Sequence, residues 1–231
     1  MQALREVSFE VHAGELVAMI GPNGAGKTTC FNILNGQLSP DSGEVLLGAR
    51  NLVGLAPHQI WRLGVGRTFQ VTATFGSMTV RENVQMALLS QSRRLYSVWR
   101  NASRFKPDEA NALLERVGMR EQAGRACAVL AYGDLKRVEL AIALAHRPRL
   151  LLMDEPTAGM APEERGALMA LAAGLARDEA LAILFTEHDM DVVFQYASRV
   201  LALHLGEVIA VGAPEEVRAH ARVRQVYLGD A

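Results

Sequence analysis

The chain has 231 residues, half of them hydrophobic, a length that is sufficient to bury the core of one domain. Its 24 Lys and Arg residues nearly balance its 25 Asp and Glu residues, and a net charge of -1 lacks the basic excess of a nucleic-acid-binding protein. Uncharged stretches such as residues 68–80 are too short to cross a bilayer. We therefore expect no nucleic-acid partner. If the chain acts with a membrane, we expect it to bind at the cytoplasmic surface of that membrane.

The first expected elements surround a glycine-rich loop. The sequence predicts strands over residues 7–11 and 15–20 and a helix over 29–34. Between them, residues 21–28 read Gly-Pro-Asn-Gly-Ala-Gly-Lys-Thr, the pattern G-x-x-x-x-G-K-[ST] of a phosphate-binding loop. Glycine is needed there because consecutive backbone N–H groups must curl closely around a phosphate.

This loop predicts nucleotide chemistry. Lys27 supplies a positive charge for the outer phosphates, Thr28 supplies a hydroxyl for Mg²⁺, and the following helix directs its positive end at the phosphates. Because the chain otherwise uses arginine for nearly all its cations, Lys27 is expected to be required chemically. The residues expected to bind the nucleotide here are Gly21, Pro22, Asn23, Gly24, Ala25, Gly26, Lys27, Thr28 and Thr29.

The middle of the chain changes character. A short strand over 44–47, a helix over 57–63 and an extended segment over 65–70 come first. A capping box from Thr79 to Glu82 then opens a helix that runs to about residue 90, and a second helix over 107–117 is closed by Gly118. We expect residues 71–129 to form a helical subdomain inserted into an α/β domain. Its arginine cluster at 93–104 either contacts a partner or acidic lipid or forms a solvated face.

The last third alternates helices with strands. Helices are expected over 135–145, 162–177 and 189–196, strands over 150–153 and 181–186, and a hairpin over 200–211. The alternation indicates a parallel sheet with its ligand at the carboxyl ends of the strands. At one such end stand two neighbouring carboxylates, Asp154 and Glu155, which should face different ways because side chains alternate along a strand. Asp154 is expected to hold Mg²⁺ and Glu155 to polarise an attacking water, although a helix cap also explains such a pair when taken alone.

Five motifs in order resemble the ATP-binding-cassette (ABC) ATPases. Besides the phosphate loop these are Arg67-Thr68-Phe69-Gln70 (Q-loop), Leu130-Ala131-Tyr132-Gly133-Asp134 (signature), Asp154-Glu155-Pro156-Thr157 (Walker B) and Thr186-Glu187-His188-Asp189 (switch histidine). The local sequences at residues 66–70, 132–134 and 212–229 are most similar to those of ATPase subunits of branched-chain amino acid importers. The resemblance implies one domain over 1–231 with a P-loop NTPase α/β core, an antiparallel β segment and the inserted helical subdomain.

The resemblance also implies residue roles. It assigns catalysis to Glu155, His188, Lys27 and Gln70, Mg²⁺ ligation to Thr28, Gln70 and Asp154, and a nucleotide-binding surface that acts on a second subunit to Ala131, Tyr132, Gly133 and Asp134. Taken alone, Gln70 also fits a polar strand end and His188 a helix cap. Gly133 fits a helix-opening phosphate nest or an ordinary turn.

Three features depart from the family pattern. Family members usually carry a further strand before residue 1 with an aromatic that stacks on adenine, and here that first strand is expected to be absent. Ala131 replaces the signature serine, and Ala161 stands where a family Asp or Asn crosses the dimer interface. These replacements favour a heterodimer over a homodimer.

The expected function is ATP hydrolysis that powers an importer of branched-chain or related amino acids. The cofactors are ATP and Mg²⁺, and the partners are transmembrane permease subunits, a second ATPase subunit and, indirectly, a periplasmic or extracellular solute-binding protein. The expected location is peripheral, on the cytoplasmic face of the inner membrane. Two alternatives stay open: an ATPase of an ABC exporter or lipid transporter, and an ATP-binding partner subunit with little hydrolysis of its own.

Overall fold

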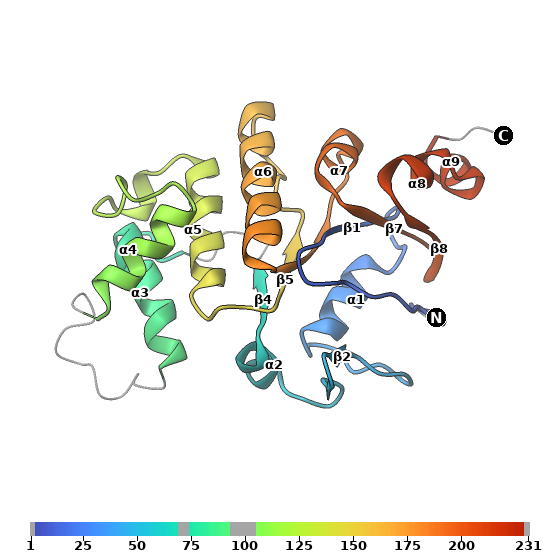
Figure 1. Ribbon diagram of the computed structural model, residues 1–231, viewed down its shortest axis with the longest axis horizontal. Helices are drawn as coiled ribbons and strands as arrows, with labels where there is room; N and C mark the ends of the chain where they lie inside the picture. The colour runs from blue at the N-terminus through green and yellow to red at the C-terminus, as the bar shows by residue number, and fades with distance from the viewer. Residues whose placement is uncertain (1–2, 69–73, 93–104, 229–231) are drawn as a thin grey trace.

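The computed structural model describes residues 3–68, 74–92 and 105–228 (Figure 1). A six-stranded sheet with strand order β4-β5-β6-β1-β7-β8 forms its centre. All neighbouring pairs are parallel except β7 and β8, which form an antiparallel hairpin. The strands are β1 (Leu16–Ile20), β4 (Val65–Thr68), β5 (Leu150–Asp154), β6 (Ala182–Thr186), β7 (Arg199–His204) and β8 (Glu207–Gly212).

The first part of the chain builds the loop-bearing side of the molecule. Helix α1 (Lys27–Leu34) follows β1, and α2 (Pro57–Leu63) precedes β4. Between them, β2 (Leu46–Leu47) and β3 (Arg50–Asn51) form a small antiparallel sheet.

The expected strand over residues 7–11 is wrong as a hydrogen-bonded element. Its side chains do alternate, with Val7, Phe9 and Val11 partly buried against the core and their neighbours exposed. Within the described residues, however, no strand pairs with this segment, and the β2–β3 sheet nearby is only two residues long on each side. The alternation of apolar residues therefore indicated only that one side of this segment is buried. A β-strand also needs a neighbouring strand with which to form backbone hydrogen bonds.

Helices dominate the stretch between β4 and β5. Thr79 caps α3 (Val80–Gln91) as expected: its hydroxyl accepts from the Glu82 N–H at 3.2 Å, and the Glu82 carboxylate accepts from the Thr79 N–H at 2.8 Å. Helix α4 (Pro107–Arg116), the 3₁₀ helix η2 (Cys127–Val129) and α5 (Tyr132–Leu144) follow, and α3, α4 and α5 pack on one another. Helix α5 begins three residues before the expected start, because Ala131 takes the N-cap position. The arginine cluster at 93–104 lies outside the described residues.

The remaining helices complete the layers. Helix α6 (Pro162–Glu179) precedes β6, α7 (Met190–Tyr196) precedes β7, and α8 (Pro214–Ala219) and α9 (Ala221–Leu228) follow β8. Figure 1 shows α3 and α4 at one end of the molecule and α8 and α9 at the other. In the described parts of the chain, no helix combines the length and the apolar character needed to cross a membrane.

Alternating strand residues divide the core into two clusters, one on each face of the sheet. Leu16, Ala18 and Ile20 of β1 join the cluster that contains buried residues of α3 to α7. Val17 and Met19 join the cluster that contains residues of α1 and α2. Both faces of the parallel strands are thus covered, which explains their unbroken apolar sequences.

The two cysteines, Cys30 and Cys127, are both buried and free. Burial raises the pKa of the Cys30 thiol to about 12 and raises that of Cys127 as well. At neutral pH neither thiol therefore supplies a reactive thiolate.

Candidate functional site

The phosphate loop joins β1 to α1 in a conformation that only glycine fits at two positions. Gly26 is the N-cap of α1 and has φ 107°, in the left-handed region that side chains disfavour. A Cβ on Gly21 would lie 2.6 Å from the Leu203 carbonyl oxygen. The fully buried β1 thus delivers the loop to the carboxyl edge of the sheet.

Lys27 points back into its own loop. Its Nζ donates to the carbonyl oxygens of Gly21 and, at 3.3 Å, of Pro22, and only 8% of the residue is exposed. Burial lowers the pKa of Lys27, while the carboxylates of Glu155 and Asp154 act in the opposite direction. Thr28 beside it is exposed, so its hydroxyl is accessible to a ligand.

Asp154 ends β5 and is held between two donors. The Thr186 hydroxyl donates to Asp154 Oδ1 at 2.9 Å, and an Arg67 guanidinium N–H donates to Asp154 Oδ2 at 2.9 Å. Thr186 ends the neighbouring strand β6, and Arg67 lies on β4 at the other side. The carboxylate is therefore fixed by both of the strands that flank β5.

Glu155 follows the last residue of β5, and its hydrogen-bond partners differ from those of Asp154. Its backbone has φ 47°, in the left-handed region, and its N–H donates to the carbonyl oxygen and the hydroxyl of Thr186 at 3.2 and 3.1 Å. Its Oε1 lies 3.0 Å from Nε2 of His188, whose side chain is about half exposed at 51%. The two neighbouring carboxylates thus have different partners, which permits different roles.

The structure brings Lys27, Asp154, Glu155 and His188 to the same sheet edge. The signature residues open α5, a helix that packs against β4, whereas β1, which precedes the phosphate loop, is separated from β4 by β5 and β6. Gln70 lies outside the described residues.

The signature opens α5 on the surface. Ala131 is its exposed N-cap, and its first turn contains Tyr132, Gly133 and Asp134. Gly133 is buried, and a Cβ there would lie 2.8 Å from Glu164 Oε1. The contact is with the flexible end of the Glu164 side chain, so it does not by itself require glycine, and the φ of Gly133 lies outside the left-handed region.

Sequence reasoning missed several supporting residues. Glu187 is buried and accepts from the Thr157 N–H at 2.9 Å, from the Thr157 hydroxyl at 2.5 Å and from the His188 N–H at 3.1 Å. Asp189 caps α7 and pairs with Arg165 at 2.7 Å. Both carboxylates flank His188 in sequence, and that position was the only available signal. Together they fix the segment that carries the histidine.

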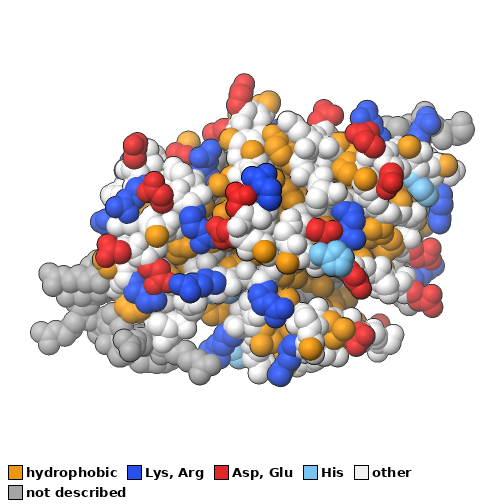
Figure 2. Space-filling model, in the orientation of Figure 1, with side chains coloured by type: hydrophobic (Ala, Val, Ile, Leu, Met, Phe, Trp, Pro, Cys, Tyr) orange, Lys and Arg blue, Asp and Glu red, His pale blue; other side chains and the backbone are white. Residues whose placement is uncertain are grey.

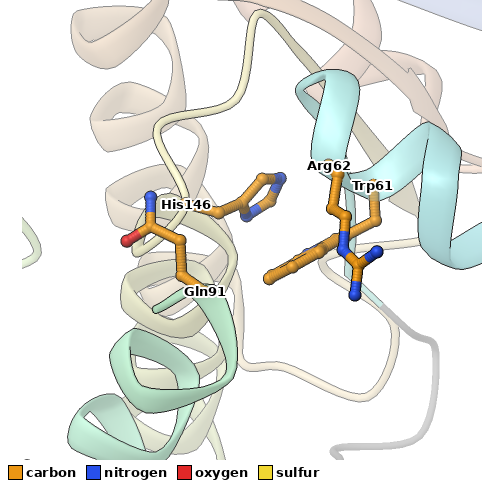
Figure 3. Close-up of a pocket in the computed structure, with 4 residues that line it drawn as sticks. All are labelled: Trp61, Arg62, Gln91 and His146. Atoms are coloured by element: carbon orange, nitrogen blue, oxygen red, sulfur yellow. The ribbon is translucent and has the colours of Figure 1, made fainter. Parts of the chain in front are cut away.

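A separate cavity of about 200 Å³ lies where α3 approaches α2 and the end of α5 (Figure 3). It is lined by Trp61, Arg62, Gln91 and His146. The rings of Trp61 and His146 are 4.7 Å apart between centroids, and Figure 3 shows them facing one another. Burial lowers the pKa of His146 to about 4, so this wall of the cavity is uncharged at neutral pH.

Comparison with known proteins agrees with this geometry. The family described as "ABC transporter" matches residues 4–158, and the family described as "Branched-chain amino acid ATP-binding cassette transporter" matches residues 207–231. The chain belongs to the ABC transporter family. The sequence-based predictions of the family and of the fold class are therefore confirmed.

Several relatives cover nearly the whole chain. The high-affinity branched-chain amino acid transport ATP-binding protein LivG of Salmonella typhimurium is 42% identical over 99% of this chain and 92% of its own length. BraF of Pseudomonas aeruginosa, described in the same words, is 38% identical over 99% and 92%. The lipopolysaccharide export system ATP-binding protein LptB of Acidithiobacillus ferridurans is 35% identical over 98% and 90%.

Solved structures agree in fold. A nucleotide-free ATP-binding cassette from an ABC transporter superposes with a TM-score of 0.86 at 28% identity, over 99% of this chain and 93% of that chain. Another ATP-binding cassette, in its ADP conformation, gives a TM-score of 0.84 at 28% identity over the same shares.

Proposed function

We propose that this chain is the ATP-hydrolysing subunit of an ABC importer for branched-chain or related amino acids. The observation that supports hydrolysis is the pairing of Glu155 with His188 beside Asp154 and the phosphate loop. The observation that favours import of these solutes is the match over residues 207–231, since whole-chain identity alone also reaches an export protein.

The geometry suggests how the residues share the work. Lys27 and the loop N–H groups neutralise the outer phosphates of ATP, and Lys27 exchanges its carbonyl partners for phosphate oxygens as it does so. Glu155 accepts the proton of the attacking water. His188, held against Glu155, contacts the γ-phosphate and reports its presence.

The oxygen donors at the site fit Mg²⁺. Thr28, Asp154 and, from its sequence position, Gln70 would hold the ion, which when bound neutralises charge on the phosphates. Among the described residues no three or more His, Cys, Asp or Glu side chains gather to hold a metal. Mg²⁺ is commonly held by one or two carboxylates together with substrate phosphates, and Asp154 and the Thr28 hydroxyl beside the phosphate loop fit that arrangement.

Permease subunits are the proposed membrane partners, with the chain bound peripherally at the cytoplasmic face of the inner membrane. Residues 71–129 would act as the inserted helical subdomain that receives a permease loop. The cavity between α2, α3 and α5 supports this place, since it joins an aromatic wall to the guanidinium of Arg62 at the junction with the subdomain. A solute-binding protein would be an indirect partner.

The second ATPase subunit is proposed to be a different chain. Ala131 and Ala161 are exposed N-caps of α5 and α6, and neither supplies a side-chain cap. Two copies of this chain would therefore lack polar groups at both facing positions, whereas an unlike partner could provide them. The two alanines are also compatible with the alternative, in which this chain is an ATP-binding partner subunit with little hydrolysis of its own. The presence of Glu155 and His188 argues against that alternative.

Replacement of the proposed base tests the hydrolytic role. Glu155→Gln should lower ATP turnover of the purified transporter by about 10²- to 10⁴-fold and leave ATP binding intact, because the amide cannot accept the proton. Glu163→Gln, which alters an exposed carboxylate in the first turn of α6, is the matched control and should leave turnover unchanged. Unchanged turnover in Glu155→Gln would remove this residue from the role of base.

A further inference from the structure

Arg67 connects three elements that meet at the nucleotide site. It lies on β4 opposite Leu152 of β5, and one guanidinium nitrogen, Nη2, donates to Asp154 Oδ2 at 2.9 Å. The other, Nη1, donates to the side-chain oxygens of Asn32 at 2.9 Å and Gln37 at 3.2 Å. Asn32 belongs to α1, so the same side chain ties the helix of the phosphate loop to the end of β5.

The ion pair between Arg67 and Asp154 is well shielded from water. Only 12% of the Arg67 side chain and 19% of the Asp154 side chain are exposed. The guanidinium carbon also lies 5.9 Å from the ring centre of the buried Phe31. Low exposure strengthens the attraction between the two charges and makes either charge costly without the other.

Arg67 places a positive charge against the carboxylate that is proposed to bind the metal ion. Thr186 already donates to Oδ1 of Asp154, and the Arg67 guanidinium takes Oδ2. A divalent cation at Asp154 would therefore stand next to a second positive charge fixed by Asn32 and Gln37. Like charges at this distance weaken each other's binding to the carboxylate.

We propose that Arg67 is a positioning residue that acts as a built-in counter-ion of Asp154 and competes with the divalent cation for it. In the absence of the cation Arg67 neutralises and orients the carboxylate, and the bound cation loosens the ion pair. The inference rests on the proposed function, because it takes Asp154 as a cation ligand. It predicts that Arg67 weakens the affinity for the cation while it stabilises the fold.

Binding of Mn²⁺ to the ADP complex measures this competition without hydrolysis. Purified wild-type chain with saturating ADP is titrated with Mn²⁺ and followed by electron paramagnetic resonance. Arg67→Met should tighten Mn²⁺ binding by about 3- to 30-fold, the range expected when one partly buried competing charge is removed. Arg67→Lys retains the charge and should stay close to the wild type.

Arg199→Met is the matched control. Arg199 makes an ion pair of the same length, 2.9 Å, with Glu15, and both side chains are mostly shielded from water, at 25% and 24% exposure. Its removal should lower the melting temperature as Arg67→Met does, but it should leave Mn²⁺ affinity unchanged. An equal tightening in Arg199→Met would show general loosening and overturn the proposal.

Unchanged or weaker Mn²⁺ binding in Arg67→Met would also overturn the proposal. If that variant does not fold, Arg67→Gln provides the comparison, and an affinity equal to that of Arg67→Lys would overturn it. Asp154→Asn separates the two levels of the argument. Should Asp154→Asn leave Mn²⁺ affinity unchanged, the assignment of Asp154 as cation ligand fails; should it weaken binding while Arg67→Met has no effect, only the counter-ion role fails.

Discussion

Asp154 and Glu155, at the end of β5, differ in their hydrogen-bond partners, and the backbone conformation of Glu155 contributes to this difference. Glu155 has a left-handed φ of 47°, a conformation that costs a residue with a side chain about 1 to 3 kcal/mol. Hydrogen bonds from its N–H to Thr186 hold it there, and the same threonine donates to Asp154. The Thr186 hydroxyl therefore accepts from the Glu155 backbone N–H and donates to the Asp154 carboxylate, so one side chain helps to position both residues.

The lowered pKa of Lys27 predicts an alkaline limit to nucleotide binding. Because burial lowers the pKa from its ordinary 10.5, the ammonium loses its proton as the pH rises through a value below 10.5. A bound phosphate favours the charged form, so ADP affinity should fall once the pH exceeds the pKa of the free protein. Calorimetric titration with ADP between pH 7 and about 10.5 should show the first bend of affinity below the ordinary lysine value.

A control variant isolates Lys27 from the other lysines. Lys106 is partly exposed and pairs with Glu109 at 2.6 Å, away from the phosphate loop. Lys106→Met should retain both the affinity for ADP and the position of the bend, whereas Lys27→Met should lose most of the affinity. A first bend at or above pH 10.5 would contradict the effect of burial on Lys27.

At the scale of single elements, local sequence signals predicted helix boundaries correctly where a short segment determines its own structure. The capping box at Thr79, the proline at the start of α2 and Gly118 after α4 each predicted a helix boundary within about two residues. Helix α8 has the same chemistry at its start, since Pro214 is its first residue and the Glu216 carboxylate accepts from the Ala213 N–H. Residues 7–11 failed because a strand depends on a partner elsewhere in the chain.

The capping box of α3 offers a direct test at this scale. Thr79→Ala removes the hydroxyl that accepts from the Glu82 N–H, and it should lower the free energy of unfolding by about 1 kcal/mol. Hydrogen bonds from Thr79 also lower the pKa of Glu82, so this contribution is present above pH 4.5 and is lost as the pH falls through the lowered value. The variant should therefore lose less stability on acidification than the wild type.

Denaturant unfolding at neutral and at acidic pH provides the measurement. Ser90→Ala, at an exposed position of the same helix, controls for helix propensity and should change the free energy of unfolding by less than about 0.5 kcal/mol. Equal losses in the two variants would show that the cap contributes nothing specific.

Over the whole molecule, the sequence predicted that the candidate site residues gather at the carboxyl edge of the central sheet. It did not predict the contacts between side chains from different strands. Alternating strands and helices were enough to expect a parallel sheet, and the parallel pairing of β1, β5 and β6 confirms it. The order β4-β5-β6-β1-β7-β8 is set by packing between distant segments. The Arg67–Asp154 ion pair joins residues 87 apart in sequence and has no local signature.

The distribution of charge over the surface can be judged only from the folded molecule. Figure 2 shows Lys and Arg side chains intermingled with Asp and Glu over the face of Figure 1, rather than gathered by sign. Electrostatic steering of one copy toward another by opposed charged faces is therefore not suggested on this side. At the proposed interface with a second ATPase, Ala131 and Ala161 supply no polar side chain.

These two alanines predict that the chain alone remains mostly monomeric. Glu155→Gln with saturating ATP and Mg²⁺ would trap any closed homodimer by blocking hydrolysis, and sedimentation velocity should still show chiefly monomer. Adding Ala131→Ser and Ala161→Asp to that variant restores a hydroxyl and a carboxylate at the helix starts. Each restored hydrogen bond should strengthen self-association by about 2- to 10-fold, because a net hydrogen bond contributes about 0.5 to 1.5 kcal/mol. A stable homodimer without these additions, together with full transport when this chain is the only ATPase, would contradict the unlike pairing and assign both nucleotide sites to identical copies.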